Sequence, residues 1–243
     1  PDTILCYDEG VEFIINSLNP SVEGDWVYDV GIPASDAGAI DNESAPTGLL
    51  SGSTFSQNLV NTSNQVQWID YTFTPRISNP RSGLSDCANG VPVIQRVYIN
   101  PRPRIEITSI SPDTILCYDE GVTFDLGSLN PSVEGVWLYD VTFTASDAGE
   151  ISNESGATGL AATDDFVQNL INTSNQVQWI EYTFTPRINN PRSGLPNCAN
   201  GVPVVQRIYI NPQPISEITS ISPDTVLCYD EGVTFDIGSL NPS

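Results

Sequence analysis

The sequence predicts an all-β protein made of tandem β-sandwich domains in a linear array, and three observations support this prediction. The first is a repeat: shifting the chain by 111 residues gives an ungapped alignment in which 82 of 111 positions agree between residues 1–111 and 112–222. The second is that apolar residues within the repeat alternate with period two. The third is that short β-rich runs are separated by Pro, Gly and Asn, while helix signals are weak.

The repeat sets the expected domain boundaries. A unit of 111 residues has the size of a complete domain and is too large for a helical solenoid repeat. We expect repeat one at 1–105 without its lead-in, repeat two at 106–216, and the start of a truncated third repeat at 217–243. The lead-in ITSIS, present at 107–111 and 218–222, has no counterpart before Pro1, so we expect the chain to be a window from a longer array.

Seven strands are expected in each repeat, which is typical of a β-sandwich. Positions that stay apolar in both copies (Val11, Phe13 and Ile15; Val122, Phe124 and Leu126) define the inward face of the second strand. The run VPVIQRVYINP ends in a proline that cannot continue a central ladder. In repeat two the expected strands are A near 105–111, A′ near 113–117, B near 122–128, C near 135–142, D and E within 143–171, F near 177–188 and G near 202–211.

Four tryptophans occupy two positions of the repeat. Trp26 and Trp137 lie in the expected C strand, where we interpret them as core residues. Trp68 and Trp179 have the parity of the outer face of strand F. They could lie under a loop, mark a bulge or be exposed for contact, and the sequence leaves these alternatives open.

The charge of the chain excludes several classes of function. There are 30 acidic residues against 8 basic ones, and the net charge of −22 repels phosphate backbones, so we expect no nucleic-acid partner. No run of eighteen apolar residues occurs, so we expect no direct membrane insertion. Histidine, the commonest general base, is absent, as are a Gly-rich phosphate loop and a GxSxG motif. The chain is therefore predicted not to be an enzyme and to need no cofactor.

Calcium is the one ion for which candidate ligands exist. Asp36 and Asp147 lie in acidic segments of the two repeats, and Ca²⁺ takes oxygen ligands. However, the neighbouring Asp41 becomes Ser152 in the second copy, and no EF-hand spacing appears. We therefore favour a solvated acidic surface over a calcium site.

Several motifs together resemble a known family. They are a cysteine before strand B (ILCYDEGVEF), the run NTSNQVQWIDYTFTP, the segment CANG before the last strand, and an exit through YINPRP. The combination resembles the PKD-like and immunoglobulin-like repeats of giant Bacteroidetes surface proteins, such as gliding-motility adhesins exported by type IX secretion. The resemblance covers each whole repeat and implies an extracellular, cell-surface array of immunoglobulin-like sandwiches. The acidic turn Cys6-Tyr-Asp-Glu-Gly10 departs from that family, which often has a shorter CxG turn.

The five cysteines leave two disulfide patterns open. Pairing within a repeat would join Cys6 to Cys87 and Cys117 to Cys198. In an immunoglobulin-like topology these positions lie at opposite ends of the domain, whereas a disulfide needs Cα atoms within about 7 Å. In an array, the A–B end of one domain faces the F–G end of the next. We therefore favour Cys6 with Cys198, and expect Cys117 and Cys228 to pair beyond the end of this chain.

The resemblance also suggests a modification and a function. Asp-Thr-Ile/Val at Thr3, Thr114 and Thr225 is similar to the O-glycosylation motif of Bacteroidetes, although Asp-Thr also simply initiates turns. The leading hypothesis is a structural stalk segment of a repetitive adhesin or filament, with neighbouring repeats of the same chain as its partners. The alternative is a module that binds surface polysaccharide through outer-face aromatics.

Overall fold

The computed structural model describes residues 3–19, 21–79, 81, 83–88, 90–147, 149–190, 197–222 and 226–241. Its contacts divide the chain into two compact units, each described here by itself. The first comprises Pro1–Arg104, Ser128–Leu138 and Pro186–Val202, and the second comprises Ile105–Gly127, Tyr139–Thr185 and Pro203–Ser243. Among the described residues, no helix is long and apolar enough to cross a membrane.

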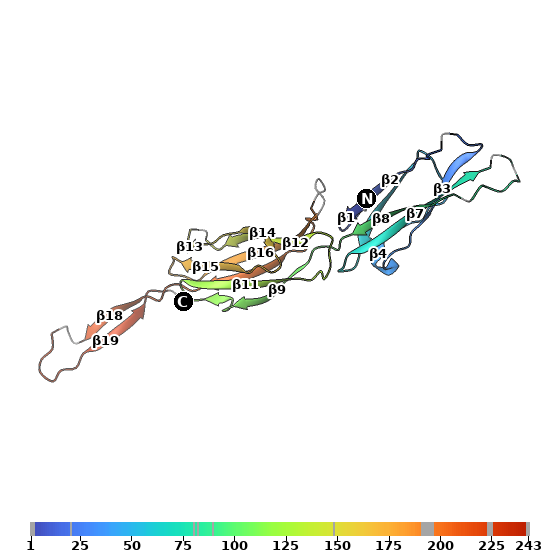
Figure 1. Cartoon of the computed structure of the whole chain (residues 1–243). Coiled ribbons are helices and arrows are strands. Elements are labelled where there is room, and N and C mark those ends of the chain that lie inside the picture. The colour runs from blue at the N-terminus through green and yellow to red at the C-terminus, as the bar shows by residue number, and fades with distance from the viewer. Residues whose placement is uncertain are drawn as a thin grey trace. The chain divides into compact units, whose positions relative to one another are not determined.

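Repeat one forms two sheets, with orders β1-β8-β7-β3-β5 and β2-β6-β4. Figure 1 shows β7 between β3 and β8, to both of which it pairs antiparallel, while β1 pairs parallel with β8. The elements are β1 (Thr3–Leu5), β2 (Glu9–Ile14), β3 (Asp25–Gly31), the 3₁₀ helix η1 (Ala37–Ala39), β4 (Ile40–Asp41), β5 (Leu49–Leu50), β6 (Thr54–Asn61), β7 (Gln67–Ser78) and β8 (Val93–Ile99).

Repeat two has the same plan with one more strand, in sheets of order β10-β17-β16-β12-β14 and β13-β15-β11-β9. The extra strand is β9, which forms the edge of the second sheet beside β11. The strands are β9 (Ile105–Ser111), β10 (Ile115–Leu116), β11 (Glu120–Ser128), β12 (Val136–Ala145), β13 (Ile151–Ser152), β14 (Ala157–Ala161), β15 (Phe166–Asn172), β16 (Gln178–Asn189) and β17 (Val204–Ile210).

The third repeat is represented by a hairpin of β18 (Ser216–Ser222) and β19 (Thr234–Ser239), which pair antiparallel. These two strands correspond to β9 and β11 of repeat two. The apolar side chains of the hairpin are exposed, including Ile218, Phe235 and Ile237. The hairpin therefore has the strand pairing of a sandwich edge without a buried core of its own.

Apolar side chains at every second position of the strands face inward and form the core of repeat one between its two sheets. Inward residues of β2, β6 and β7 form an aromatic cluster, with ring centroids 4.8 Å apart for Phe13–Tyr71 and 5.9 Å apart for Phe55–Tyr71. The buried residues around it come from both sheets: Leu5, Val11, Ile15, Tyr28, Val30, Ile40, Phe55, Leu59, Ile69, Tyr71, Phe73, Val97 and Ile99. Burial of these side chains provides the main drive for folding this repeat.

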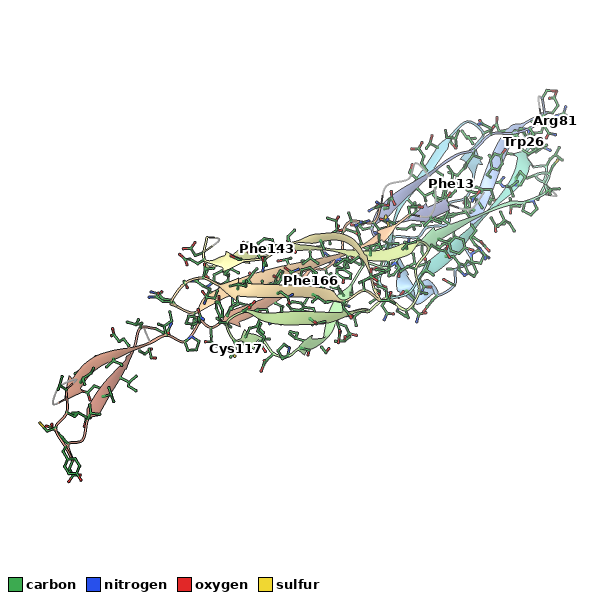
Figure 2. The ribbon with its side chains drawn as sticks, turned by 60° about the vertical axis from the view of Figure 1, so that its left-hand side comes forward. Phe13, Trp26, Arg81, Cys117, Phe143 and Phe166 are labelled. Carbon is green, nitrogen blue, oxygen red and sulfur yellow. A yellow bond between two sulfur atoms is a disulfide. The ribbon has the colours of Figure 1, made fainter. Side chains whose placement is uncertain are left out.

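Repeat two has an equivalent core. Phe124, Phe166 and Tyr182 correspond to the three aromatics of repeat one, and the rings of Phe166 and Tyr182 are 5.2 Å apart. Phe124, Tyr182 and Leu170 are fully buried. Figure 2 shows Phe13 and Phe166 on the strands of their own repeats.

The strand predictions made from sequence agree with the structure. Expected strands A, A′, B, C, F and G overlap β9, β10, β11, β12, β16 and β17, and the expected D and E region contains β13, β14 and β15. The all-β sandwich class is confirmed. Trp137 is buried on β12, as predicted, and Trp26 on β3 is partly buried.

Candidate functional site: the joint between repeats

A cluster of polar contacts links the two repeats within the first compact unit. We call it the joint and define it by segments 6–9 and 64–66, segment 100–104, segment 129–134 and segment 198–202. Every one of these segments belongs to the first unit. The joint therefore contains residues of both repeats although it lies in one compact body.

A disulfide between Cys6 and Cys198 crosses the joint, with a Cα–Cα distance of 5.2 Å. Of the two patterns left open by the sequence, the structure contains the one that links the repeats. Cys87 and Cys117, which would complete the pairs within each repeat, are free and exposed. Cys228 is also free and exposed. One covalent bond thus connects the start of repeat one to the last loop of repeat two.

The acidic turn after each first cysteine explains why the CYDEG motif recurs. The backbone amide of Cys6 donates to a side-chain oxygen of Glu9 at 2.7 Å, and Asp8 adopts a left-handed backbone with φ of 59°. Aspartate tolerates this region better than most residues because its short side chain bonds locally. Cys117 and Glu120 repeat the same contact at 2.7 Å. The turn therefore orients the cysteine.

Cys198 is held from the other side by a backbone bridge. Its amide donates to the carbonyl of Ile188 at 2.9 Å, and the amide of Ile188 donates back at 3.1 Å. Cys87 makes the same bridge with Ile77 in repeat one. The two cysteines differ in environment, because Cys198 is 1% exposed whereas Cys87 is exposed.

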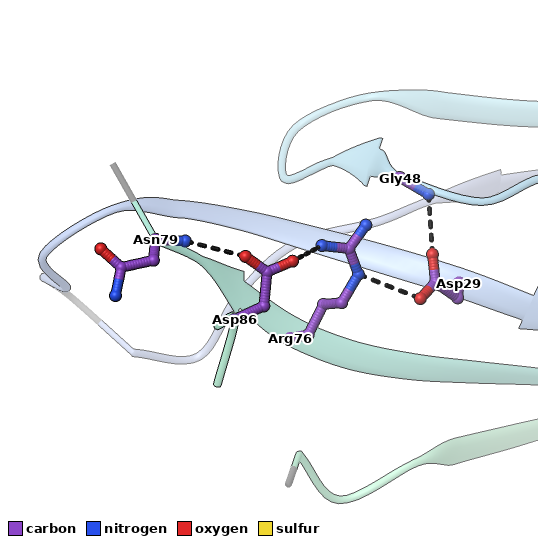
Figure 3. Close-up of polar contacts among 5 residues, drawn as sticks. All are labelled: Asp29, Gly48, Arg76, Asn79 and Asp86. Atoms are coloured by element: carbon purple, nitrogen blue, oxygen red, sulfur yellow. Dashed lines mark hydrogen bonds and ion pairs between the residues drawn. The ribbon is translucent and has the colours of Figure 1, made fainter. Parts of the chain in front are cut away.

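The loop that carries Cys87 is also fixed by a charged network, shown in Figure 3. Arg76 on β7 forms ion pairs with Asp29 and with Asp86, the Nε–Oδ2 distance to Asp29 being 3.0 Å. Asp86 also accepts a hydrogen bond from the amide of Asn79 at 3.0 Å, and Asp29 accepts one from the amide of Gly48 at 2.8 Å. The network therefore connects β3 and β7 to the residue before Cys87.

Asn100 makes a reciprocal pair of hydrogen bonds across the joint. Its side-chain Nδ2 donates to the carbonyl of Glu134 at 3.0 Å, and its Oδ1 accepts from the amide of Glu134 at 2.8 Å. Asn100 is fully buried, and its backbone amide donates to the carbonyl of Leu5 at 2.9 Å. A buried amide side chain with all these groups satisfied fixes the register of the two backbones that it joins.

Asn130 plays a similar part in the loop between β11 and β12. Its Oδ1 accepts from the amide of Arg104 at 2.7 Å, and its Nδ2 donates to the carbonyls of Arg102 at 3.1 Å and Asn64 at 3.3 Å. The amide of Leu129 donates to the carbonyl of Arg104 at 3.0 Å. Asn130 therefore connects repeat two both to the linker and to repeat one.

Two further sets of contacts complete the joint. The amide of Val202 donates to the carbonyl of Pro103 at 2.9 Å, and the amide of Val66 donates to the carbonyl of Ser132 at 3.1 Å. Arg102 donates to the carbonyl of Asn200 at 3.0 Å, and Asn200 donates to the carbonyl of Tyr7 at 2.9 Å. These four hydrogen bonds add to those of Asn100 and Asn130 in linking the segments of the joint.

The second unit contains one half of the same arrangement. Asn241 occupies the position of Asn130: its Oδ1 accepts from the amide of Ile215 at 2.8 Å and its Nδ2 donates to the carbonyl of Gln213 at 3.0 Å. The amide of Leu240 donates to the carbonyl of Ile215 at 3.0 Å, as Leu129 does to Arg104. Cys117, labelled in Figure 2, is the exposed equivalent of Cys6. The contacts of Asn130 and Leu129 therefore recur at the corresponding residues of the next repeat.

Sequence reasoning missed the asparagines of the joint. Asn100 and Asn130 each precede a proline and are identical at the corresponding positions 211 and 241. An Asn-Pro pair is typical of a turn, so it did not distinguish a linking residue from an ordinary loop residue. The recurrence of both pairs in each copy was the available signal.

The other candidate site residues have local roles or remain predictions. Asp36 accepts from the amide of Gly38 and Asp147 from that of Gly149, each at 3.0 Å. Within the described residues, no group of three or more His, Cys, Asp or Glu could hold a metal ion.

The three threonines proposed as glycosylation sites differ in what the structure describes. Thr3 lies in β1 and Thr114 bonds to Asp113, whose Oδ1 accepts from the amide of Thr114 at 2.6 Å. Thr225 lies outside the described residues. Glycosylation at these sites stays a prediction.

The outer-face tryptophans are partly covered by arginine. The guanidinium of Arg96 lies 4.0 Å from the ring centroid of Trp68, and that of Arg207 lies 4.1 Å from that of Trp179. Arg96 also contacts both carboxylate oxygens of Asp70 at 2.7 Å, and this hydrogen bonding lowers the pKa of Asp70 below its usual range. The predicted outward parity is confirmed, and each indole forms part of a cation–π pair.

Comparisons with known proteins add only distant likenesses. No protein-family model and no curated protein matches the chain. Among solved structures, the calcium binding domain CBD12 of CALX1.1 is 11% identical, with 86% of this chain and 96% of that chain covered and a TM-score of 0.27. The D0-D1 domain of intimin is 14% identical (86% and 95% covered, TM-score 0.26), and the fibronectin(III)-like modules of Clostridium thermocellum CbhA are 8% identical (87% and 90% covered, TM-score 0.28). With TM-scores this low, these likenesses carry no inference about function.

Proposed function

We propose that this chain is a non-catalytic structural segment of a repetitive extracellular protein, in which adjacent sandwich domains are joined covalently. The observation that carries the proposal is the Cys6–Cys198 disulfide. This bond connects the start of repeat one to the last loop of repeat two, so it restrains the separation of these two segments. A structural segment under tension needs such a restraint to keep its adjacent domains together.

The polar network of the joint supports the same role. Asn100 and Asn130 are both buried, and each bonds to backbone groups of the other repeat or of the linker. Unlike an apolar contact, such bonds are directional, so they favour one relative placement of the bonded segments. The recurrence of the Asn130 contacts around Asn241 supports a joint that is repeated along an array.

The chemistry of the joint supports an extracellular setting. Disulfides persist in oxidising compartments and are rare in the cytosol. The net charge of −22 keeps such a protein soluble and discourages contact with anionic surfaces. Within this proposal, the resemblance noted above suggests a stalk of a cell-surface adhesin of the gliding-motility type, exported by type IX secretion.

Peptide mapping without reduction, on material at least three repeats long, tests this function. We expect every joint to give a linkage of the Cys6–Cys198 type, because each repeat contains the same acidic turn and the same cysteine bridge. A map dominated by linkages of the Cys6–Cys87 type would overturn the proposal. It would mean separately closed domains with an unrestrained hinge.

Binding of polysaccharide through the outer aromatics is the alternative function. It has weaker support, because Arg96 and Arg207 lie over the indoles that would stack on a sugar ring. A glycan array probed with the parent chain and with a Trp68→Ala/Trp179→Ala variant separates the two. Specific binding by the parent that the variant loses would favour the module over the structural segment.

A further inference from the structure

Four side chains of the same kinds come together in each repeat: a glutamate, the serine that follows it, a glutamine and a tyrosine. They are identical at a shift of 111 residues, as Glu43, Ser44, Gln57 and Tyr71 in repeat one and Glu154, Ser155, Gln168 and Tyr182 in repeat two. The glutamate and serine lie in the loop that passes from one sheet to the other, between β4 and β5 or between β13 and β14. The glutamine and tyrosine lie on strands of opposite sheets. Each set belongs to a single compact unit.

In repeat one, the side-chain amide of Gln57 lies between two hydroxyl groups. The hydroxyl of Tyr71 donates to Oε1 of Gln57, and Nε2 of Gln57 donates to Oγ of Ser44. Nε2 also donates to the backbone carbonyl of Ser44 at 3.0 Å. Gln57 is 7% exposed and Tyr71 is fully buried, so this amide is largely shielded from bulk water.

In repeat two, the serine hydroxyl lies against the glutamine amide itself. Oγ of Ser155 is 3.2 Å from Oε1 and 3.0 Å from Nε2 of Gln168, so it lies beside Cδ, the carbon that carries both atoms. Oε1 accepts from the backbone amide of Ser155 at 2.9 Å and from the hydroxyl of Tyr182 at 3.4 Å. Two donors of this kind stabilise the negative charge that develops on a carbonyl oxygen during nucleophilic attack.

A carboxylate acts on each of these amide sites. Among the described residues, Oε2 of Glu43 is buried and has no hydrogen-bond partner. Burial, and then the charge of Glu43, raises the pKa of Tyr71, and burial followed by the charge of Glu154 raises the pKa of Tyr182. A carboxylate next to a serine can accept the proton of its hydroxyl and so activate it as a nucleophile.

We propose that each repeat forms an internal ester bond between the serine Oγ and the glutamine Cδ, with release of ammonia. The bonds are Ser44–Gln57 and Ser155–Gln168. The folded chain forms each of them once, by acting on itself. Each bond fixes the loop that crosses between the sheets to a strand of the second sheet. This inference goes beyond the proposed function and does not depend on it, because the Cys6–Cys198 bond uses other residues.

The reaction needs no oxidant and no second substrate. Oγ of Ser44 attacks Cδ of Gln57 while its proton passes to the carboxylate of Glu43, and the electron pair of the carbonyl bond moves to Oε1, to which Tyr71 donates. The tetrahedral carbon then re-forms its carbonyl group and expels Nε2. The nitrogen takes the proton from Glu43 and leaves as ammonia. One carbon–oxygen bond is formed, one carbon–nitrogen bond is broken, and the carboxylate is regenerated.

Another serine–glutamine contact in repeat one provides a control. Oγ of Ser35 donates to Oε1 of Gln67 at 2.5 Å, whereas Nε2 of Gln67 donates to a different residue, Ser63, at 3.0 Å. The hydroxyl of Ser35 also accepts from the amide of Trp68 at 2.9 Å. This hydroxyl therefore faces the carbonyl oxygen as a donor, and we expect it to form no ester.

The intact mass of the full chain tests the proposal. Each ester removes one ammonia molecule, about 17 Da. We expect the folded chain to weigh two ammonia molecules less than its sequence and its disulfide imply. Relative to their own sequences, Ser44→Ala and Ser155→Ala should each lack only one, and the double variant should lack none. The control Ser35→Ala should keep the full deficit.

Peptide mapping then locates the bond in repeat one. Chymotrypsin can cleave after Leu49, Leu50 and Phe55, all of which lie between Ser44 and Gln57. The two resulting peptides should remain joined, and hydroxylamine, which cleaves esters, should separate them.

The role of the tyrosine is tested by Tyr71→Phe, which keeps the ring in the core and removes the donor to Oε1. Loss of one such donor slows attack on a carbonyl about 100-fold, so freshly purified Tyr71→Phe chain should lack only the ammonia of repeat two. Because Glu43 takes part in the reaction, the effect of its charge on stability is measured in the Ser44→Ala chain, in which repeat one forms no ester.

The masses also define the results that would overturn the proposal. A folded chain with the full mass of its sequence and disulfide would show that the four groups form hydrogen bonds only. A deficit that persists in the Ser44→Ala/Ser155→Ala variant would mean that ammonia is lost elsewhere, for example by cyclisation at Asn200-Gly201. Loss of an ammonia deficit in Ser35→Ala would assign the bond to the wrong serine. In each case a mapped Cys6–Cys198 bond leaves the proposed function standing.

Discussion

Removing the disulfide of the joint should destabilise whichever repeat unfolds first. The perturbation is the double variant Cys6→Ser/Cys198→Ser, which leaves no unpaired partner to react with the other thiols. If repeat one unfolds while repeat two stays folded, the disulfide closes a loop of roughly 100 residues, from Cys6 to the linker at Arg104. In the chain-entropy treatment, closing a loop of that length contributes about 4.7 kcal/mol. Native disulfides removed from small secreted domains cost about 2–5 kcal/mol, which gives the expected range.

Urea unfolding followed by tryptophan fluorescence provides the assay. With a slope of about 1–3 kcal/mol/M, a loss of about 4.7 kcal/mol lowers the first unfolding midpoint by at least about 1.5 M. Tryptophans lie in both repeats, so both transitions are visible. Cys228→Ser is the control, because Cys228 is exposed and forms no disulfide in the structure. A double variant whose midpoint lies within a few tenths of a molar of the parent would refute the reasoning.

Three further predictions follow from buried polar groups. Asn130→Ala should lower the free energy of unfolding by about 2–3 kcal/mol, because three hydrogen bonds worth about 1 kcal/mol each are lost. Burial, and then the charge of Asp41, raises the pKa of Glu43. The folded state therefore favours protonated Glu43, and this stabilisation is present below pH 4.5 and lost as the pH rises through the folded-state pKa. Because Glu43→Gln removes the unfavourable buried charge, it should raise the urea midpoint at pH 7. Burial raises the pKa of Tyr139 to about 12 from a usual value of 10, so stability should fall between pH 10 and 12, and Tyr139→Phe should reduce that fall.

Each of these has its own control. Asn58→Ala removes one exposed hydrogen bond, to Asp8, and should cost well under half as much as Asn130→Ala. Equal losses would mean that Asn130 is no more than a surface residue. For Glu43→Gln, the same comparison at pH 3.5 should show no gain; a gain of equal size at both values would rule out ionisation as the cause. Tyrosinate absorbance during alkaline titration checks Tyr139, whose contribution near pH 12 should vanish in the Phe variant.

The strands could be predicted because each depends on a pattern local in sequence. Alternation at Val122, Phe124 and Leu126 identifies the buried face of β11 without knowledge of its neighbours. The outward parity of Trp179 followed from the same rule. Such alternation can be recognised in a single sequence because the backbone of a strand always places successive side chains on opposite faces.

Most of the joint could not be predicted, because it depends on the pairing of distant segments. The Cys6–Cys198 pair could be favoured from the expected ends of the strands. Asn100 and Glu134, however, are 34 residues apart, and no pattern in either segment indicates that they meet. The stacking of Arg96 on Trp68 likewise requires the register of β7 against β8, where Trp68 pairs with Tyr98. The register of two paired strands is set by the packing of the core, so no sequence motif of β7 or β8 alone predicts which residues lie opposite each other.

The Cys6–Cys198 bond also determines which part of this chain carries tension. When the two ends of the polypeptide are pulled, the shortest covalent route runs from residue 1 to Cys6, across the sulfur atoms, and from Cys198 to residue 243. The 192 residues of sequence separation between the cysteines are bypassed, so most of both sandwich domains is shielded from extension. At about 3.4 Å per residue, this withholds about 650 Å of contour length until the sulfur–sulfur bond is reduced. Reduction of a single bond would therefore lengthen the tether by the residues that the disulfide had kept out of the loaded route.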